Sequence, residues 1–478
     1  MNRAHQPKCR FKGYCLWPAL FLLALAGCAA VGPDYSVPDM TVPAAWNTAA
    51  VGGLATGEND SAVLARWWET IDDPILTALI RKAASQNLDV KQALAGIRKA
   101  RAQRMGSRAD RFPAVDATGS IRKSGTDTGE SELYSTGFDA SWEIDIFGGV
   151  RRSVEASQAD LEASREKLND VMVSLLAEVA VSYIDLRTDQ ARLAVVEARV
   201  AAQQQTFELV DAAYRAGSGD ALAAEQARTS LQSARAEIPD LKTSLEASLN
   251  SLAVLTGQAP GSLHSQLSTI APLPDVAVEL AVGVPADTLR RRPDIRKAER
   301  TLAAETARVG VATADLYPKF TLSGSIGLEA LRLDELVQSA SRTWRIGPSV
   351  SWAVFDAGAV RSRIEIQSAV QEQALLSYEA AVLGALEEVE NALVAYAREQ
   401  EKYRLLQAAA QSARSAAQLA GQQYEAGMVG FSTVLDAQRA LLSFESQQVQ
   451  SRGKRLSDLV RIYKALGGGW AFAGSSAS

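Results

Sequence analysis

The sequence contains one unusual passage twice. Residues 141–152 (SWEIDIFGGVRR) return in altered form as residues 351–362 (SWAVFDAGAVRS), 210 positions later. A period of about 200 residues is too long for a solenoid repeat. We therefore expect a duplicated structural half, each with a helix, an X-Pro break, two strands, a long helix, a Gly break and a second helix. Further matches lie on both sides of the passage: NLDV at 87–90 with RPDI at 292–295, YRAG at 214–217 with YEAG at 424–427, and EQAR at 225–228 with DAQR at 436–439.

Each half contains a long stretch that is almost free of helix breakers. Residues 150–216 include no Gly or Pro, and residues 359–426 are interrupted only by Gly384 and Gly421. A helix of 67 residues would extend about 100 Å at about 1.5 Å per residue. Apolar residues recur at heptad spacing in both stretches, which is typical of coiled-coil packing. The expected seam residues are Leu193, Val196, Val200, Gln203, Phe207, Val210 and Tyr214 in the first half, and Val382, Leu386, Val389, Leu393 and Tyr396 in the second.

Glycine pairs end both long helices. The first pair begins at Gly217 and the second at Gly427, and each is followed by another helical stretch that ends near Gly257 or Gly467. Glycine is the residue that most readily stops a helix at its C-terminus. The sequence therefore predicts an antiparallel helical hairpin in each half.

The first 27 residues indicate an export signal. Four basic residues precede an apolar run at residues 16–26. This run is shorter than the ~20 residues of a membrane-spanning helix and fits the core of a signal peptide. It ends in LAGC, which is similar to a bacterial lipobox and implies cleavage between Gly27 and Cys28 and lipidation, with palmitate among the lipids, at Cys28. Ala29 follows instead of the Asp that holds lipoproteins at the inner membrane, so the same resemblance implies sorting to the cell outer membrane.

Composition argues against several classes of function. All three cysteines lie at or before the predicted cleavage site, so the mature chain has no pair for a disulfide. Cleavage removes four of the 50 basic residues and none of the 55 acidic ones, which leaves an acidic chain poorly suited to nucleic acid. The mature chain keeps one histidine, His264, and no cysteine besides the lipidated one. We therefore expect no metal site, no cofactor, no catalytic residues and no enzymatic activity.

Four segments alternate apolar and polar residues, at 115–122, 137–146, 320–329 and 344–352. A soluble β-sandwich strand has the same pattern, but strands of about 10 residues in an outer-membrane lipoprotein are typical of membrane β-strands. Four strands cannot close a barrel, and lipid does not tolerate open edges. Two chains would give about 8 strands, whose interior side chains fill, whereas three would give 12 and a lumen. The predicted fold is mainly α with membrane β: a trimeric 12-stranded barrel continued by a long α-helical coiled-coil periplasmic tunnel.

Several passages are shared with one known family. They are the lipobox, VGPDYSVP (31–38), RRPDIRKAERTLAAETARVGVATADLYPKFTLSGSIG (291–327), WAVFDAG (352–358) and YEAGMVGFSTVLDAQRALL (424–442). Through them the sequence resembles the outer-membrane efflux family of TolC-like outer-membrane factors, and in particular its NodT-type lipoproteins of RND efflux systems. The resemblance implies a homotrimeric channel that passively conducts drugs or other small molecules. It also implies two partners, a periplasmic adaptor (membrane fusion protein) and an inner-membrane RND pump, and a role in drug resistance.

The same resemblance implies a periplasmic gate formed by the inner hairpin of the second half. Asp436 falls at the position of an acidic ring and Tyr424 at that of a tether. Thr433 falls where some members carry a second Asp, and Val429 where some carry a tethering Arg, so this chain departs from the family there. Three symmetry-related carboxylates would repel one another and would attract cations. The predicted adaptor-docking points are the hairpin tips, at Gly217, Ser218, Gly427 and Met428.

Two alternatives remain open at the level of sequence: the outer-membrane component of a type I protein secretion system, and a non-conducting structural lipoprotein. The alternating strands argue against the second, because a simple spacer has no use for them. The predicted segments are a signal peptide (1–27), an extended N-terminal segment (28–72), a first repeat (73–290), a second repeat (291–466) and a C-terminal tail (467–478).

Overall fold

The computed structural model describes residues 30–470 except residues 56, 58–60, 128 and 275–279. The predicted cleavage and lipidation site at Gly27 and Cys28 therefore lies outside the described residues. The chain forms two compact units, and helices from both repeats contribute to each. The first unit takes the residues up to Asp39, Ile97–Ser164 and Lys297–Tyr378, and the second takes Met40–Gly96, Arg165–Arg296 and the residues from Glu379 on.

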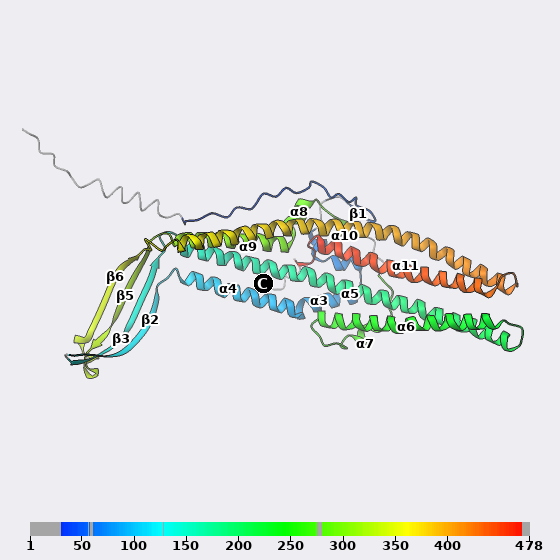
Figure 1. Cartoon of the computed structure of the whole chain (residues 1–478), viewed down its shortest axis with the longest axis horizontal. Helices are drawn as coiled ribbons and strands as arrows, with labels where there is room; N and C mark the ends of the chain where they lie inside the picture. Colours follow the sequence, from blue (N-terminus) through cyan, green and yellow to red (C-terminus); the bar gives the residue numbers. More distant parts are fainter. Residues whose placement is uncertain (1–29, 56, 58–60, 128, 275–279, 471–478) are drawn as a thin grey trace, which may run out of the picture. The chain divides into compact units, whose positions relative to one another are not determined.

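The helices of the two repeats have identical lengths, which confirms the predicted duplication. The matched pairs have 22, 67 and 35 residues. In Figure 1 each long helix runs beside the second helix of its own hairpin. The pairs are α4 (Leu88–Ala109) with α9 (Pro293–Ala314), α5 (Gly149–Arg215) with α10 (Ala359–Glu425), and α6 (Ala221–Leu255) with α11 (Phe431–Ala465).

Both long helices end in the same backbone motif. The Gly217 amide donates to the Tyr214 carbonyl over 2.9 Å, and the Ser218 amide donates to the Ala213 carbonyl over 3.0 Å. Gly427 and Met428 make the equivalent bonds at the second tip, over 2.9 and 2.8 Å. Both glycines have positive φ, 74° and 69°, which is the left-handed conformation that a Schellman cap requires.

The predicted heptad seams are largely buried. In α5, Leu193, Val196 and Val210 lie in the interior, and the polar seam residue Gln203 is only 4% exposed. In α10, the buried seam residues are Val382, Val389, Leu393 and Tyr396. The prediction was wrong at Tyr214, which is 47% exposed. Tyr214 lies in the last turn of α5, and α6 begins only at Ala221, so too little of the partner helix remains there to cover the ring.

The four predicted strands form one antiparallel sheet in the order β2-β3-β5-β6. Figure 1 shows the four strands side by side. The strand bounds are Ala114–Thr126 for β2, Gly129–Ile144 for β3, Lys319–Ala330 for β5 and Arg342–Ser351 for β6.

The register of this sheet separates apolar from polar residues. One row across the four strands is Ala117, Phe138, Ile326 and Trp344, and the row beside it is Asp116, Asp139, Ser325 and Arg345. Since neighbouring residues of a strand point to opposite faces, one face is apolar and the other polar. Trp344 is 74% exposed, so the apolar face is uncovered in the single chain.

The core of the second unit packs around two adjacent tryptophans, Trp67 and Trp68, which are fully buried. Trp67 also stacks on Tyr463 of α11, with 5.4 Å between the ring centroids. Among the described residues, no helix has both the length and the hydropathy that a membrane crossing requires. The shorter elements are β1 (Leu54–Ala55), α2 (Ser61–Ala65), η1 (Trp67–Ile71), α3 (Pro74–Gln86), α7 (His264–Leu267), β4 (Leu280–Ala281), α8 (Pro285–Arg291), η2 (Leu333–Glu335) and η3 (Ser339–Ser341).

Candidate functional site

The hairpin ends of the second unit are joined by a small apolar cluster, which we call the tip cluster. It brings together residues of all four hairpin helices, so the two tips are packed against each other. Burial of these side chains is the main force that holds the tips together, because the hydrophobic effect scales with apolar area removed from water. The tip cluster consists of Val210, Ala224, Ala227, Ala420, Phe431, Val434 and Leu435.

The three predicted gate residues lie in different surroundings at this end. Tyr424 is half-buried against the tip cluster, with its ring centroid 5.4 Å from that of Phe431. Thr433 and Asp436 are exposed on α11. The Asp436 carboxylate is 3.6 Å from an Arg439 nitrogen, a surface ion pair of the kind that contributes little energy. The structure thus packs Tyr424 inward and leaves Asp436 accessible.

A buried polar layer crosses from α5 to α6 just beyond the tip cluster. In the amide orientation that satisfies both of its groups, Gln203 donates to the Ser230 carbonyl over 3.0 Å and accepts from Arg199 Nε over 3.1 Å. Burial holds the pKa of the Arg199 guanidinium below its usual value, although Glu237, 3.2 Å away, opposes this shift. The structure explains why a glutamine interrupts the predicted apolar seam: it satisfies polar groups of both helices.

Arg439 connects this polar layer to the second hairpin, and sequence reasoning missed it. Its guanidinium donates to Ser230 Oγ over 3.3 Å, from α11 to α6. The signal was present in the repeated motif EQAR and DAQR, whose glutamate or aspartate and arginine form i,i+3 ion pairs in both copies. The pairs are Glu225 with Arg228 over 3.1 Å and Asp436 with Arg439 over 3.6 Å.

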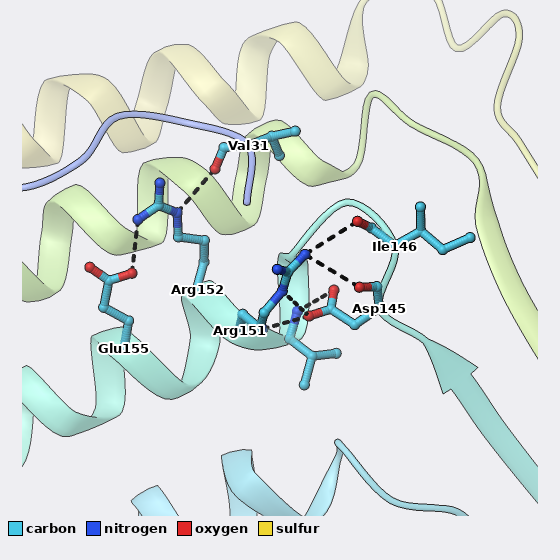
Figure 2. A network of polar contacts seen from close by, with 7 residues as sticks. Val31, Asp145, Ile146, Arg151, Arg152 and Glu155 are labelled. Atoms are coloured by element: carbon cyan, nitrogen blue, oxygen red, sulfur yellow. Dashed lines mark hydrogen bonds and ion pairs between the residues drawn. The ribbon is translucent and has the colours of Figure 1, made fainter. Parts of the chain in front are cut away.

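The repeated passage that stands out in the sequence forms the junction between strand and long helix. Asp145 accepts hydrogen bonds from the amides of Val150 (3.1 Å) and Arg151 (2.9 Å), and the Arg151 guanidinium donates to the Ile146 carbonyl over 3.2 Å (Figure 2). A carboxylate at a helix N-terminus satisfies free amides and complements the helix dipole. Asp145 therefore caps the N-terminus of α5.

The second copy of the passage repeats this cap with a different residue spacing. Asp356 accepts from the amides of Gly358 (2.9 Å) and Val360 (2.7 Å) at the start of α10. These hydrogen bonds lower the pKa of the Asp356 carboxyl. Both junctions therefore use an aspartate to begin a long helix.

The duplicated tryptophans also make equivalent contacts. The Trp142 indole donates to the Arg111 carbonyl over 3.0 Å, and the Trp352 indole donates to the Leu316 carbonyl over 3.1 Å. Each accepting carbonyl lies two residues before the proline that precedes a strand. The indole therefore fastens the end of one strand to the chain entering its neighbour.

Comparison with known proteins decides the family. The sequence pattern of outer membrane efflux proteins matches residues 79–258 and 284–468, one segment for each half of the duplication. The chain is an outer membrane efflux protein. The resemblance noted in the sequence is confirmed, and the family consists of channel-type efflux proteins.

Individual relatives extend this similarity over almost the whole chain. Nodulation protein T of Rhizobium leguminosarum bv. trifolii is 34% identical over 459 residues, which cover 93% of this chain and 94% of that protein. Solvent efflux pump outer membrane protein SrpC of Pseudomonas putida is 31% identical over 464 residues, covering 95% and 98%. The solved outer-membrane channel OprN has a TM-score of 0.86 and 40% identity, covering 92% of this chain and 99% of that one.

As an outer membrane efflux protein, the chain resides in the outer membrane, extends into the periplasm and is the channel component of a tripartite efflux system. The amphipathic sheet is the part whose exposed apolar face suits lipid. In the described ranges, no group of three or more His, Cys, Asp or Glu side chains is arranged to hold a metal ion.

Proposed function

We propose that three copies of this efflux protein close one 12-stranded barrel, through which small molecules leave the cell. The sheet carries this proposal. Its outer strands β2 and β6 each pair on one side only among the described residues, and one face is apolar and exposed. Because lipid does not tolerate unpaired strand edges, β2 of one copy must find a partner, and β6 of the next copy supplies it.

The hairpin tips are the proposed docking points for a periplasmic adaptor, which in turn joins an inner-membrane RND pump. The tip residues Gly217, Ser218, Gly427 and Met428 are all exposed. Their Schellman caps use the local backbone groups, so the tips present fixed shapes rather than loose loops. The proposed cargo is drugs and other small molecules, with organic solvents suggested by the name of the relative SrpC.

The same proposal assigns Asp436 to an acidic ring at the periplasmic end, with Tyr424 and Thr433 beside it as further gate candidates. Exposure of the Asp436 carboxylate supports this role, because only an accessible group can face its symmetry mates. Three such carboxylates repel one another, which lowers the cost of opening, and they concentrate cations. Tyr424 packs on Phe431 and in this way supports the helices that carry the acidic ring.

Membrane attachment is the last part of the proposal. Cleavage after Gly27 and lipidation of Cys28 would anchor each copy to outer-membrane lipid, in addition to the barrel. Mass spectrometry of the N-terminal peptide tests this directly, and a peptide that begins at Cys28 without acyl chains would refute it.

The channel itself is tested with purified full-length protein in detergent and in planar bilayers. We expect SDS-resistant trimers that dissociate on heating, together with single-channel conductance. A monomer that produces no channels would contradict the proposal.

The gate assignment is tested in the same bilayers with a pair of matched variants. Asp436→Ala removes the proposed ring and should change the conductance or reduce the preference for cations. Glu225→Ala is the control, because Glu225 occupies the equivalent place in the first repeat and is also exposed, on α6. Recordings of Asp436→Ala that match those of the wild type would remove Asp436 from the gate.

A further inference from the structure

The first described residues of the chain lie against the junction where β3 leads into α5. We call residues 30–39 the N-terminal strap. The Val31 amide donates to the Phe147 carbonyl over 3.0 Å. Arg152 Nε donates to the Val31 carbonyl over 3.1 Å (Figure 2). The strap is therefore held at Val31 by one main-chain bond to Phe147, two residues after the capping Asp145, and by one bond from the Arg152 side chain.

Arg152 is the centre of this contact. Its Nη2 donates to the Gly32 carbonyl over 3.3 Å and to the Asp34 carboxylate over 2.6 Å, and its Nη1 donates to Glu155 over 2.8 Å. A planar guanidinium offers five donors in a fixed fork, which suits several acceptors at once. The Arg152 side chain is 5% exposed.

The two ends of the Arg152–Asp34 pair differ in their surroundings. The Asp34 side chain is 90% exposed, so water screens the pair and its ionic part contributes little. The two strap carbonyls matter more, because a buried guanidinium left without them would lose acceptors that water cannot replace. Burial opposes the charge of Arg152, but the bonds to Asp34 and Glu155 outweigh it and raise its pKa.

Three glycines allow the strap to approach so closely. A Cβ atom on Gly32 would lie 2.3 Å from Gly310 Cα, and a Cβ on Gly310 would lie 2.8 Å from Arg152 Cγ. A Cβ on Gly148 would lie 2.5 Å from the Ala30 Cβ. All three distances are shorter than a real Cβ contact. Gly32 and Gly148 therefore pack against the main chain at Gly310 and Ala30, and Gly310 leaves room for the Arg152 side chain.

The second copy of the junction lacks these features. Ser362 stands where Arg152 stands in the first copy, and one hydroxyl cannot serve several acceptors. Gly358 corresponds to Gly148 and has a similar positive φ, 90° against 83°, yet a Cβ there would meet nothing within 4 Å. The close packing around Gly148 is therefore not needed for the turn itself, which the second copy makes without it.

We propose that Arg152, Gly32, Gly148 and Gly310 form a seat that fixes the N-terminal strap at the strand–helix junction, with Arg152 as a positioning residue. Cys28 precedes Ala30 by two residues, and a chain spans at most about 3.6 Å per residue. The seat therefore limits how far a lipid attached to Cys28 can lie from the strand–helix junction. This consequence rests on the proposed lipidation, whereas the seat itself does not.

The experiment measures how narrowly the strap is held. Spin labels on cysteines introduced at Ser36 and Gln373, both exposed in the first unit, give a distance distribution by pulsed electron paramagnetic resonance on the full-length protein. In trimers that contain one labelled copy among unlabelled ones, the proposal predicts one narrow peak in the wild-type background. Arg152→Ala and Gly148→Ala should each lose that peak, while both still form the trimers of the parent protein.

Matched controls separate the seat from general damage. Arg361→Ala removes an exposed arginine from the first turn of α10, and Gly358→Ala adds the same backbone strain as Gly148→Ala without blocking anything. Both should keep the narrow peak. If either Arg152→Ala or Gly148→Ala fails to assemble, the other still decides.

The variant Cys28→Ser tests whether the seat or the lipid causes the narrow distance distribution. The seat is made of protein, so this variant should keep the narrow peak. A peak that survives Arg152→Ala and Gly148→Ala but disappears in Cys28→Ser would overturn the proposal, since the lipid alone would then hold the strap. An unlipidated N-terminal peptide in the wild type would instead refute the proposed lipidation. The spin-label distances in Arg152→Ala and Gly148→Ala would still test the seat.

Discussion

Asn87 and Arg292 occupy equivalent positions in the two repeats and make the same contact with different chemistry. Asn87 Nδ2 donates to the Leu255 carbonyl over 3.0 Å, at the last residue of α6. Arg292 Nη1 donates to the Ala465 carbonyl over 2.6 Å, at the last residue of α11. The residue before α4 thus fastens the end of α6, and the residue before α9 fastens the end of α11.

The difference between the two contacts lies in what else each residue requires. The Asn87 amide oxygen accepts from the amides of Asp89 and Val90 and so completes a neutral cap. The buried Arg292 guanidinium instead needs Asp294 and Glu388, and Lys464 supports Glu388 in turn. The ion-pair distances are 2.7 Å from Arg292 to Asp294, 2.7 Å from Arg292 to Glu388 and 2.9 Å from Lys464 to Glu388.

This comparison teaches that the duplication has kept a geometric relation rather than a residue. A neutral group and a charged one can fasten the same pair of helix ends, but only the charged one brings a network with it. Removal of a buried charge leaves its partners uncompensated, whereas removal of an amide leaves only hydrogen bonds unmade.

The largest expected effect follows from breaking the two contacts separately. Arg292→Ala should lower the free energy of unfolding by about 3 kcal/mol, the lower end for a broken buried pair, because its carboxylates are partly exposed. Asn87→Ala should lower it by about 1 kcal/mol, as expected for a neutral cap. Denaturant unfolding of the purified protein measures both. Equal losses from the two variants would show that the charged network adds nothing to the contact.

A fall in pH should also affect the two repeats unequally, with a smaller effect than the substitutions. Burial alone would raise the pKa of the Asp294 carboxyl, but the hydrogen bond from Arg292 outweighs it and lowers that pKa. Burial alone would also raise the pKa of the Glu388 carboxyl. The bonds from Lys464 and Arg292 outweigh burial, so this pKa is lowered as well. A carboxyl with a lowered folded pKa stabilises the fold above its unfolded pKa, and this contribution is lost as the pH falls through the folded value.

We therefore expect the start of α9 to lose hydrogen-exchange protection below about pH 4, the range of ordinary carboxyl pKa values. The start of α4 should lose less, because Asn87 does not titrate. Exchange is measured by mass spectrometry on peptides that cover the two helix starts, after correction for the pH dependence of intrinsic exchange. Identical loss in both repeats would contradict this assignment.

The smallest expected effect concerns the two tryptophans, where the repeats use the same residue. Trp142→Phe and Trp352→Phe each remove one indole hydrogen bond to a carbonyl and keep an aromatic ring, so each should cost about 1 kcal/mol. Thermal dissociation of the trimer in SDS gives the comparison. Clearly unequal shifts would show that one junction depends on its tryptophan for more than this bond.

Much of the helical architecture could be predicted from the sequence. Absence of Gly and Pro over residues 150–216 predicts a helix that is observed at Gly149–Arg215, and the second long helix is equally close to its expected bounds. These limits depend on local backbone preferences, which neighbouring residues set. The seam failed at Tyr214 because burial there depends on where the partner helix begins.

The candidate sites were less accessible to sequence reasoning. Arg439 meets a serine 209 positions away, and Arg152 meets the Val31 carbonyl 121 positions away. Repetition of EQAR as DAQR indicated that Arg439 matters, but it did not name its partner. No pattern in the sequence pointed to Arg152, whose counterpart in the second repeat is a serine.

The sequence by itself determined the duplication, the lengths of the helices, the glycine caps at the hairpin tips and the alternation that makes the sheet amphipathic. Each of these depends on residues close together in the chain, through φ preferences, helix breaking and the period of two along a strand. Only the tertiary structure decided that Asn87 and Arg292 fasten equivalent helix ends, and that the strap rests on Arg152. Such contacts depend on how distant helices pack, and packing selects one partner from many chemically equivalent groups.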